Sequence, residues 1–200
     1  NWDQDHPFER LIVETEVTPD VEAVSWMNPN IASSERRKVI TGIPGKPGIV
    51  WTLDAATGDF LWATQTNYQN IIVGVDVEGR KGITNPEIDI TEIGQQKLVC
   101  PTTQGGINWN SVGYSPQTNS LYTPTNNTCM NFALRPVEPT VGLHHASARS
   151  SVDIGPEDTG QVGQFASIDV ATGETRWTYK QRAGIGGSVL TTGGGLVFVS

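Results

Sequence analysis

The chain has little positive charge, only two cysteines and no long hydrophobic run, and each shortage excludes a class of function. Lys and Arg number 13 against 21 Asp and Glu, which gives a formal net charge of −8. The only basic cluster is Arg36-Arg37-Lys38, so nucleic acid is not an expected partner. The longest apolar stretches have the length of strands, and no membrane-spanning segment is predicted.

The two cysteines, Cys100 and Cys129, are not spaced closely enough for a metal site. From the residues alone they are either two buried thiols or one disulfide, and a disulfide would indicate an oxidising compartment. A starting Met and a signal peptide are also missing, and the chain stops within an apparent strand at residues 196–200. We therefore expect an internal piece of a longer protein, so the missing signal peptide excludes no location.

Glycine and proline, by contrast, are plentiful. The chain contains 22 Gly and 12 Pro, and only 36% of its residues are hydrophobic. This balance predicts many tight turns and an all-β fold. A length of 200 residues would suffice for one ordinary domain with a good core.

The stretch that organises the chain is residues 46–62, KPGIVWTLDAATGDFLW. Two strand-like runs flank the turn Asp54-Ala-Ala-Thr-Gly58. Asp and Thr oxygens can accept hydrogen bonds from the N–H groups of such a turn, and Gly58 tolerates the positive φ that a bulged turn requires. The stretch therefore predicts a β-hairpin.

The same turn returns at Asp169-Val-Ala-Thr-Gly173, and in each copy a tryptophan follows the Gly by four positions, at Trp62 and Trp177. A nine-residue pattern that occurs twice predicts a repeat architecture. We expect each indole to lie flat on the next repeat and to donate its N–H to a backbone carbonyl. The role predicted for both tryptophans is structural.

Strand-like runs divide the chain into blades of a β-propeller. The first blade covers residues 9–64, and residues 65–103 form a long connection. The second covers residues 104–180 with an irregular insertion at 131–160, and residues 184–200 start a third blade. About two and a half blades cannot close a ring, so the rest of the propeller is expected upstream and downstream.

The paired repeats resemble the tryptophan-docking motif of the eight-bladed quinoprotein dehydrogenases, which use pyrroloquinoline quinone (PQQ). Asn1-Trp2-Asp3, Gly45-Lys46-Pro47-Gly48 and Gly105-Gly106-Ile107-Asn108-Trp109 are similar to further motifs of the methanol and ethanol dehydrogenases in that family. The resemblance covers most of the chain and implies part of an eight-bladed β-propeller.

The resemblance also implies roles for single residues. Asp3 takes the place of the catalytic base and is a candidate metal ligand, while Lys46 takes the place of the basic residue that reaches the quinone oxygens. Asn108 and Trp109 correspond to a pair that contacts the cofactor. Asp5, two positions after Asp3, matches a second acidic metal ligand of lanthanide-dependent members, with calcium as the competing metal.

Two further points follow from the resemblance. Cys100 and Cys129 stand where the methanol dehydrogenases have a structural disulfide. Ile185 stands where they have a tryptophan before Gly186-Gly187, so one contact on the cofactor side is altered.

The implied activity is oxidation of an alcohol to an aldehyde in the periplasm, either free or associated with the membrane, with a cytochrome c or a membrane quinone as electron acceptor. Two alternatives stay open. One is a non-catalytic PQQ-like propeller that serves as a scaffold, as in outer-membrane assembly. The other is a polyol or sugar quinoprotein dehydrogenase. The joint presence of Asp3, Lys46 and Asn108-Trp109 favours an enzyme, because a scaffold has no reason to keep them together.

Overall fold

The computed structural model describes residues 2–6, 8–31, 34–142, 148–153, 155–156 and 160–200. These residues form sixteen β-strands and one short 3-10 helix, η1 (Pro86–Ile88), and no α-helix. The predicted all-β fold is therefore confirmed. No helix in this described part is long and apolar enough to cross a membrane.

The first blade is an antiparallel sheet in the order β1-β3-β4-β5-β2. Its strands are β1 (Leu11–Val17), β2 (Trp26–Met27), β3 (Glu35–Gly42), β4 (Ile49–Asp54) and β5 (Phe60–Gln65). Side chains alternate between the two faces of β1, so Val13 and Val17 are buried while Ile12 of the same strand is 68% exposed. The segment between β1 and β3 also contributes an edge strand, because Trp26 of β2 pairs with Ala63 of β5.

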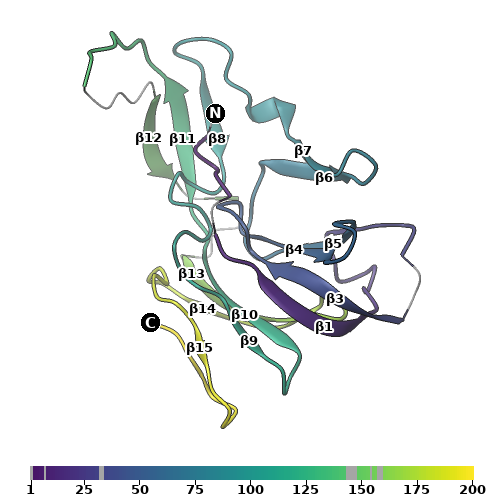
Figure 1. Cartoon of the computed structure of the whole chain (residues 1–200). Coiled ribbons are helices and arrows are strands. Elements are labelled where there is room, and N and C mark those ends of the chain that lie inside the picture. The colour runs from purple at the N-terminus through teal and green to yellow at the C-terminus, as the bar shows by residue number, and fades with distance from the viewer. Residues whose placement is uncertain (1, 7, 32–33, 143–147, 154, 157–159) are drawn as a thin grey trace.

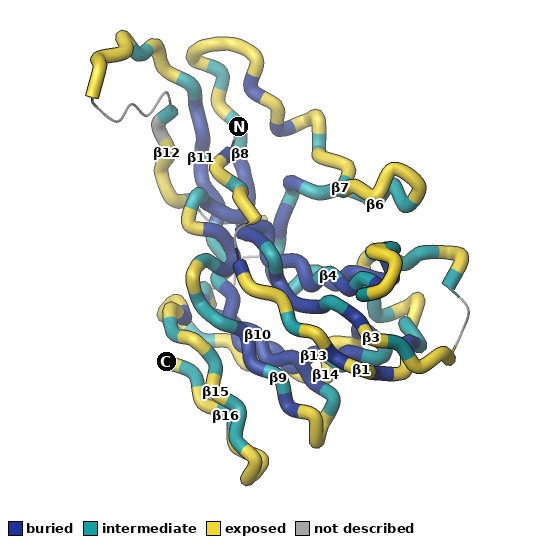
Figure 2. Tube along the Cα trace, in the orientation of Figure 1, coloured by how far each residue is buried: buried dark blue, intermediate teal, exposed yellow. Residues whose placement is uncertain are grey.

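The second blade is a four-stranded antiparallel sheet in the order β14-β13-β10-β9. Its strands are β9 (Gly113–Ser115), β10 (Ser120–Asn126), β13 (Gly163–Asp169) and β14 (Thr175–Gln181). The two blades lie side by side (Figures 1 and 2). The core that they share contains Val39, Leu61 and Leu121. A short pair, β15 (Leu190–Thr191) and β16 (Val197–Phe198), follows at the C-terminus.

The prediction of an irregular insertion at 131–160 is wrong for the described part of that stretch. Strands β11 (Cys129–Leu134) and β12 (Ala148–Asp153) pair with each other, and β11 also pairs with β8 (Gln96–Val99) from the connection. This three-stranded sheet stands apart from the two blades (Figure 1). It forms because Met130 and Phe132 of β11 bury their side chains beside Val99 and Trp2. Residues 143–147, 154 and 157–159 of the insertion lie outside the described residues.

The connection contains a second hairpin, β6 (Ile72–Asp76) with β7 (Lys81–Thr84), followed by η1. The hairpin covers part of the first blade, because Ile72 and Val75 pack against the cluster of Ile49, Phe60 and Ala63. The predicted long connection is thus built from a hairpin, a helical turn and β8. Cys100 follows β8 and is bonded to Cys129 at the start of β11, which confirms the predicted disulfide.

Both repeat turns have the predicted chemistry. The Asp54 carboxylate accepts hydrogen bonds from the N–H groups of Ala56 at 2.8 Å and Thr57 at 3.2 Å. In the second copy, the Asp169 carboxylate accepts from Ala171 at 2.7 Å. Gly58 and Gly173 have φ values of +74° and +76°. The two turns therefore have the same local structure.

Trp62 lies on the turn of the second blade, as the repeat predicts. Its side chain is fully buried, and a Cβ added to Gly173 would stand 3.0 Å from its Cε3 atom. The hydroxyl of Thr64 donates a hydrogen bond to the Gly173 carbonyl at 2.9 Å. The predicted bond from the indole N–H is wrong, because Trp62 Nε1 is buried and has no acceptor among the described residues. Thr64 supplies that polar contact instead, and the indole contributes packing alone.

Trp177, the tryptophan of the second copy, is 44% exposed. Its ring packs against Phe165 of its own blade at a centroid distance of 5.6 Å and against Tyr122 at 6.0 Å. Among the described residues no further turn lies on it as Gly173 lies on Trp62. The same sequence pattern thus gives a buried and a half-exposed indole, depending on the neighbouring sheet.

Gly173→Ala is expected to destabilise the protein more than Gly58→Ala does. Both positions have the same positive φ, so the backbone cost is shared. An added Cβ at Gly173 would lie 2.4 Å from Val24 Cγ1, whereas at Gly58 the nearest atom is Arg80 Nη1 at 3.9 Å. We expect overpacking to add about 1–3 kcal/mol at Gly173. Urea unfolding of both variants measures the difference, and equal losses would contradict the close contact.

Candidate functional site

Three of the residues singled out from the sequence meet in one charge cluster. Lys46 Nζ lies 3.1 Å from Asp3 Oδ2 and 2.8 Å from Asp5 Oδ1. The Lys46 side chain is 9% exposed, while the side chains of Asp3 and Asp5 are 63% and 52% exposed. An ammonium group embedded in the protein therefore holds two carboxylates at the surface.

The N-terminal segment reaches this position because its alternate residues are anchored. Trp2 is buried, and its Nε1 donates a hydrogen bond to the Ile88 carbonyl at 3.2 Å. Gln4 Nε2 donates to the Thr102 carbonyl at 3.1 Å. These anchors on both sides hold Asp3 between them, and its side chain is 63% exposed. Asp3 itself has a φ of +58°.

A glycine pair closes the other side of Lys46. The Gly106 N–H donates to the Lys46 carbonyl at 2.8 Å. Gly105 has a φ of +83°, and a Cβ there would stand 2.8 Å from Lys46 Cβ. Only glycine permits both this conformation and this approach, so the Gly-Gly of the motif has a steric reason.

The charges in the cluster stabilise one another. Hydrogen bonding from Lys46 lowers the pKa of Asp5 below its ordinary value. Burial alone would lower the pKa of Lys46, but hydrogen bonds to Asp5 and Asp3 outweigh it and raise that pKa. Lys46 is therefore a cation, and Asp5 an anion, throughout the physiological pH range.

Asn108 and Trp109 do not touch the charge cluster. Asn108 Nδ2 donates to the Gln104 carbonyl at 3.0 Å. Trp109 is 79% exposed and meets Phe8 edge to face, with ring centroids 6.0 Å apart. Their link to the cluster is the loop that precedes them, through the contact of Gly105 with Lys46. Their contact with a cofactor stays a prediction.

Three of the predicted catalytic, cofactor-binding and metal-binding residues line cavities, and these are two different cavities. Asp3 and Asp5 line a cavity of about 390 Å³, together with Trp2, Pro47 and Thr84. Asn108 lines a second cavity, of about 440 Å³, with Gly105 and Ile185 among its other residues. Gly105 thus faces the second cavity while its backbone packs on Lys46.

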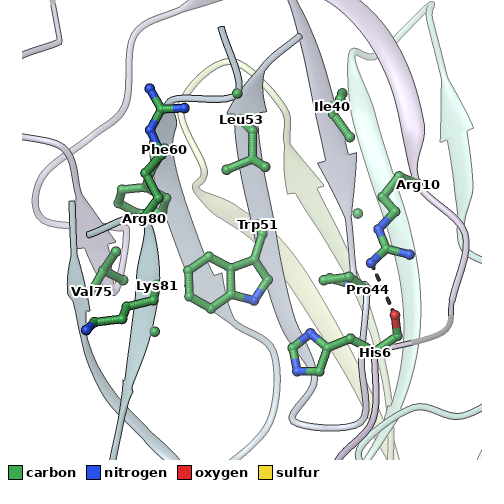
Figure 3. Close-up of a pocket in the computed structure, with 13 residues that line it drawn as sticks. His6, Arg10, Ile40, Pro44, Trp51, Leu53, Phe60, Val75, Arg80 and Lys81 are labelled. Atoms are coloured by element: carbon green, nitrogen blue, oxygen red, sulfur yellow. Dashed lines mark hydrogen bonds between the residues drawn. The ribbon is translucent and has the colours of Figure 1, made fainter. Parts of the chain in front are cut away.

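A third cavity, of about 290 Å³, lies between the first blade and the β6–β7 hairpin (Figure 3). Trp51 and Phe60 give it an aromatic wall, with ring centroids 5.8 Å apart. Arg10 also lines it and donates to the His6 carbonyl at 3.2 Å. The sequence carries no motif for this cavity, because its walls come from elements that are distant in sequence. None of the predicted site residues except the turn residue Gly58 lines it.

The donor set of the charge cluster fits a hard cation in part. Asp3 and Asp5 converge on one positive centre, the Lys46 nitrogen, and carboxylate oxygens are the ligands that calcium and lanthanide ions prefer. The described residues contain no group of three or more acidic, His or Cys side chains that could hold a metal. These two residues can therefore supply only part of a coordination sphere.

Comparison with known proteins adds a family context. No family model matches the chain. A putative dehydrogenase XoxF from Paracoccus denitrificans is 29% identical over 174 residues, which cover 82% of this chain and 29% of that protein. The lanthanide-dependent methanol dehydrogenase of Methylacidiphilum fumariolicum (strain SolV) is 26% identical over 199 residues, or 99% of this chain and 30% of that protein.

Among solved structures, a europium-containing methanol dehydrogenase superposes with a TM-score of 0.81 at 25% identity. The match covers 99% of this chain and 32% of that one. The homologues of the chain are thus methanol dehydrogenases, including lanthanide-dependent ones, and quinone-linked alcohol dehydrogenases, which confirms the resemblance drawn from the motifs. The chain spans about 30% of the length of the curated relatives it matches.

Proposed function

We propose that the chain is part of a PQQ-dependent dehydrogenase that oxidises an alcohol to an aldehyde. The observation that carries the proposal is the contact of Lys46 with both Asp3 and Asp5. It brings Lys46, the cation that the motifs single out, within hydrogen-bonding distance of the two carboxylates that they also single out. The names of the relatives, which are alcohol and methanol dehydrogenases, support the same class of reaction.

Asp3 is suited to the role of general base. Its side chain is 63% exposed and lines a cavity, so a small hydroxyl compound can reach it. Lys46 binds Oδ2 and fixes the orientation of the group. A carboxylate has a second oxygen, and Asp3 can accept the hydroxyl proton there.

Lys46 is suited to bind negative oxygen. Its raised pKa keeps it charged, and its burial removes competing water. When bound, PQQ would supply the oxidising chemistry and the metal would polarise it, with Asp3 and Asp5 as ligands for calcium or a lanthanide ion. Lys46, Asn108 and Trp109 would hold the quinone.

The setting of the reaction is also part of the proposal. The Cys100–Cys129 disulfide supports an oxidising compartment, and we propose the periplasm. The electron acceptor would be a cytochrome c or a membrane quinone. The name of one relative, methanol dehydrogenase [cytochrome c] subunit 1 of Paracoccus denitrificans, supports the first of these.

The full-length protein, loaded with PQQ and either Ca²⁺ or La³⁺, tests the proposal. We expect it to reduce an artificial dye when a primary alcohol is added. The metal that gives the higher rate indicates whether the enzyme is calcium-dependent or lanthanide-dependent. Turnover with polyols or sugars but not with simple alcohols would favour the sugar-oxidising alternative. Absence of turnover with every substrate and both metals would overturn the proposal in favour of a scaffold.

A further inference from the structure

Asn126, the last residue of β10, lies where three segments of the chain meet. Its backbone N–H donates to the Gly106 carbonyl at 2.6 Å. Its side chain binds one residue twice: Nδ2 donates to the Ile185 carbonyl at 3.0 Å, and Oδ1 accepts from the Ile185 N–H at 2.8 Å. The carboxamide therefore pairs with Ile185 as a neighbouring strand would.

The hydrogen bonds continue from Asn126 to the charge cluster. Gly106 accepts from Asn126 and donates to the Lys46 carbonyl at 2.8 Å. A chain of hydrogen bonds thus runs from the backbone of Lys46 to Ile185, with Gly106 and Asn126 as the two residues between them. The fit at the far end is close, because a Cβ added to Gly184 would stand 2.9 Å from Asn126 Oδ1.

Asn126 and Ile185 both line the 440 Å³ cavity that Asn108 also lines. The described residues that line it include no ionisable side chain, and their polar side-chain groups are amides and hydroxyls. Ile185 is 4% exposed and packs on Tyr122 and Phe165 of the second blade. One wall of the cavity thus depends on a segment that Asn126 ties to the rest of the site.

We propose that Asn126 is a positioning residue for the cofactor: it holds the Ile185 segment against the loop of Gly106 and Asn108. This rests on the proposed function, since PQQ is the ligand. Asn126 needs both a donor and an acceptor for this task, so only a carboxamide at this distance completes the pair. Without it, the Ile185 N–H and carbonyl lose their partners and the wall of the cavity loosens.

A matched control exists in Asn70. Its Nδ2 donates to the Leu98 carbonyl at 2.9 Å, and its Oδ1 accepts from the Cys100 N–H at 2.9 Å. Asn70 thus bridges backbone groups in the same way, but at the three-stranded sheet instead of beside Asn108. Asn70→Ala removes an equivalent pair of hydrogen bonds beside the disulfide, and neither bond leads to a residue predicted to contact the cofactor.

The experiment compares Asn126→Ala and Asn70→Ala in the full-length protein. PQQ affinity is measured by fluorescence titration, and hydrogen exchange is measured for the peptide that contains residues 184–187. We expect Asn126→Ala to weaken PQQ binding about 10-fold or more, as the loss of a supporting residue does at metal sites, and to speed exchange at Ile185. Asn70→Ala should leave both quantities close to the wild-type values.

Equal PQQ affinity for wild type and Asn126→Ala, or an equal loss in Asn70→Ala, would overturn the positioning role. If Asn126→Ala fails to fold, Asn126→Asp gives the same test, because it keeps the size and the acceptor but loses the donor. A wild type that binds no PQQ refutes the proposed function, whereas a wild type that binds it normally while Asn126→Ala does so equally well refutes only the positioning role.

Discussion

Asp3→Asn in the full-length, PQQ-loaded protein is expected to lower the turnover number by about 10²–10⁴-fold, the range typical of a lost general base. The amide keeps the shape of the carboxylate, and its oxygen can still accept the hydrogen bond from Lys46 Nζ, now 3.1 Å away. It cannot accept a proton from an alcohol. The steady-state rate of dye reduction at saturating alcohol measures the effect.

Two controls separate this effect from a general loss of charge. Asp89→Asn removes an exposed carboxylate after η1, and we expect it to leave turnover unchanged. PQQ affinity should stay near the wild-type value in Asp3→Asn, since Lys46 remains in place. Turnover of Asp3→Asn within a few-fold of wild type would remove Asp3 from the role of base.

Trp62→Ala is expected to cost about 3–5 kcal/mol of the free energy of unfolding, as for other buried tryptophans replaced by alanine. Trp62 is fully buried, and its ring fills the space between its own blade and Gly173 of the second. Its removal would leave a cavity at the contact between the blades. Urea unfolding monitored by circular dichroism measures the loss.

Trp62→Phe tests how the indole acts. Because Nε1 has no acceptor among the described residues, phenylalanine should lose packing area but no hydrogen bond. We expect the loss for Trp62→Phe to be less than half of the loss for Trp62→Ala. A nearly equal loss would indicate that the indole N–H does find a carbonyl in the full-length protein.

The two blades could be predicted because their determinants are local. The Asp54 and Asp169 carboxylates bind the N–H groups two residues ahead, so each turn is specified within five residues of sequence. Burial alternates along β1 and along part of β4, whereas β5 and β13 beside the turns are buried along almost their whole length. The structural position of Trp62 followed from the repeat, but the repeat did not indicate that its N–H would have no acceptor among the described residues.

The three-stranded sheet could not be predicted because its pairing is distant. Met130 of β11 pairs with Val99 of β8, and no turn motif joins the two strands. Likewise, the charge cluster could be expected only through the resemblance. Spacing alone does not bring Asp3 to Lys46; the anchoring of Trp2 at Ile88 does so, and that contact is invisible in the sequence.

The Cys100–Cys129 bond also joins the connection and the insertion, the two segments outside the blades, into a single accessory module. Strand β8 lies at the end of the connection at 65–103, and β11 lies at the start of the insertion at 131–160. The two strands pair, are linked next to the disulfide and share one apolar core. Deleting either segment would expose the apolar face of the other. A shortened protein that keeps only the blades therefore requires the removal of both segments together.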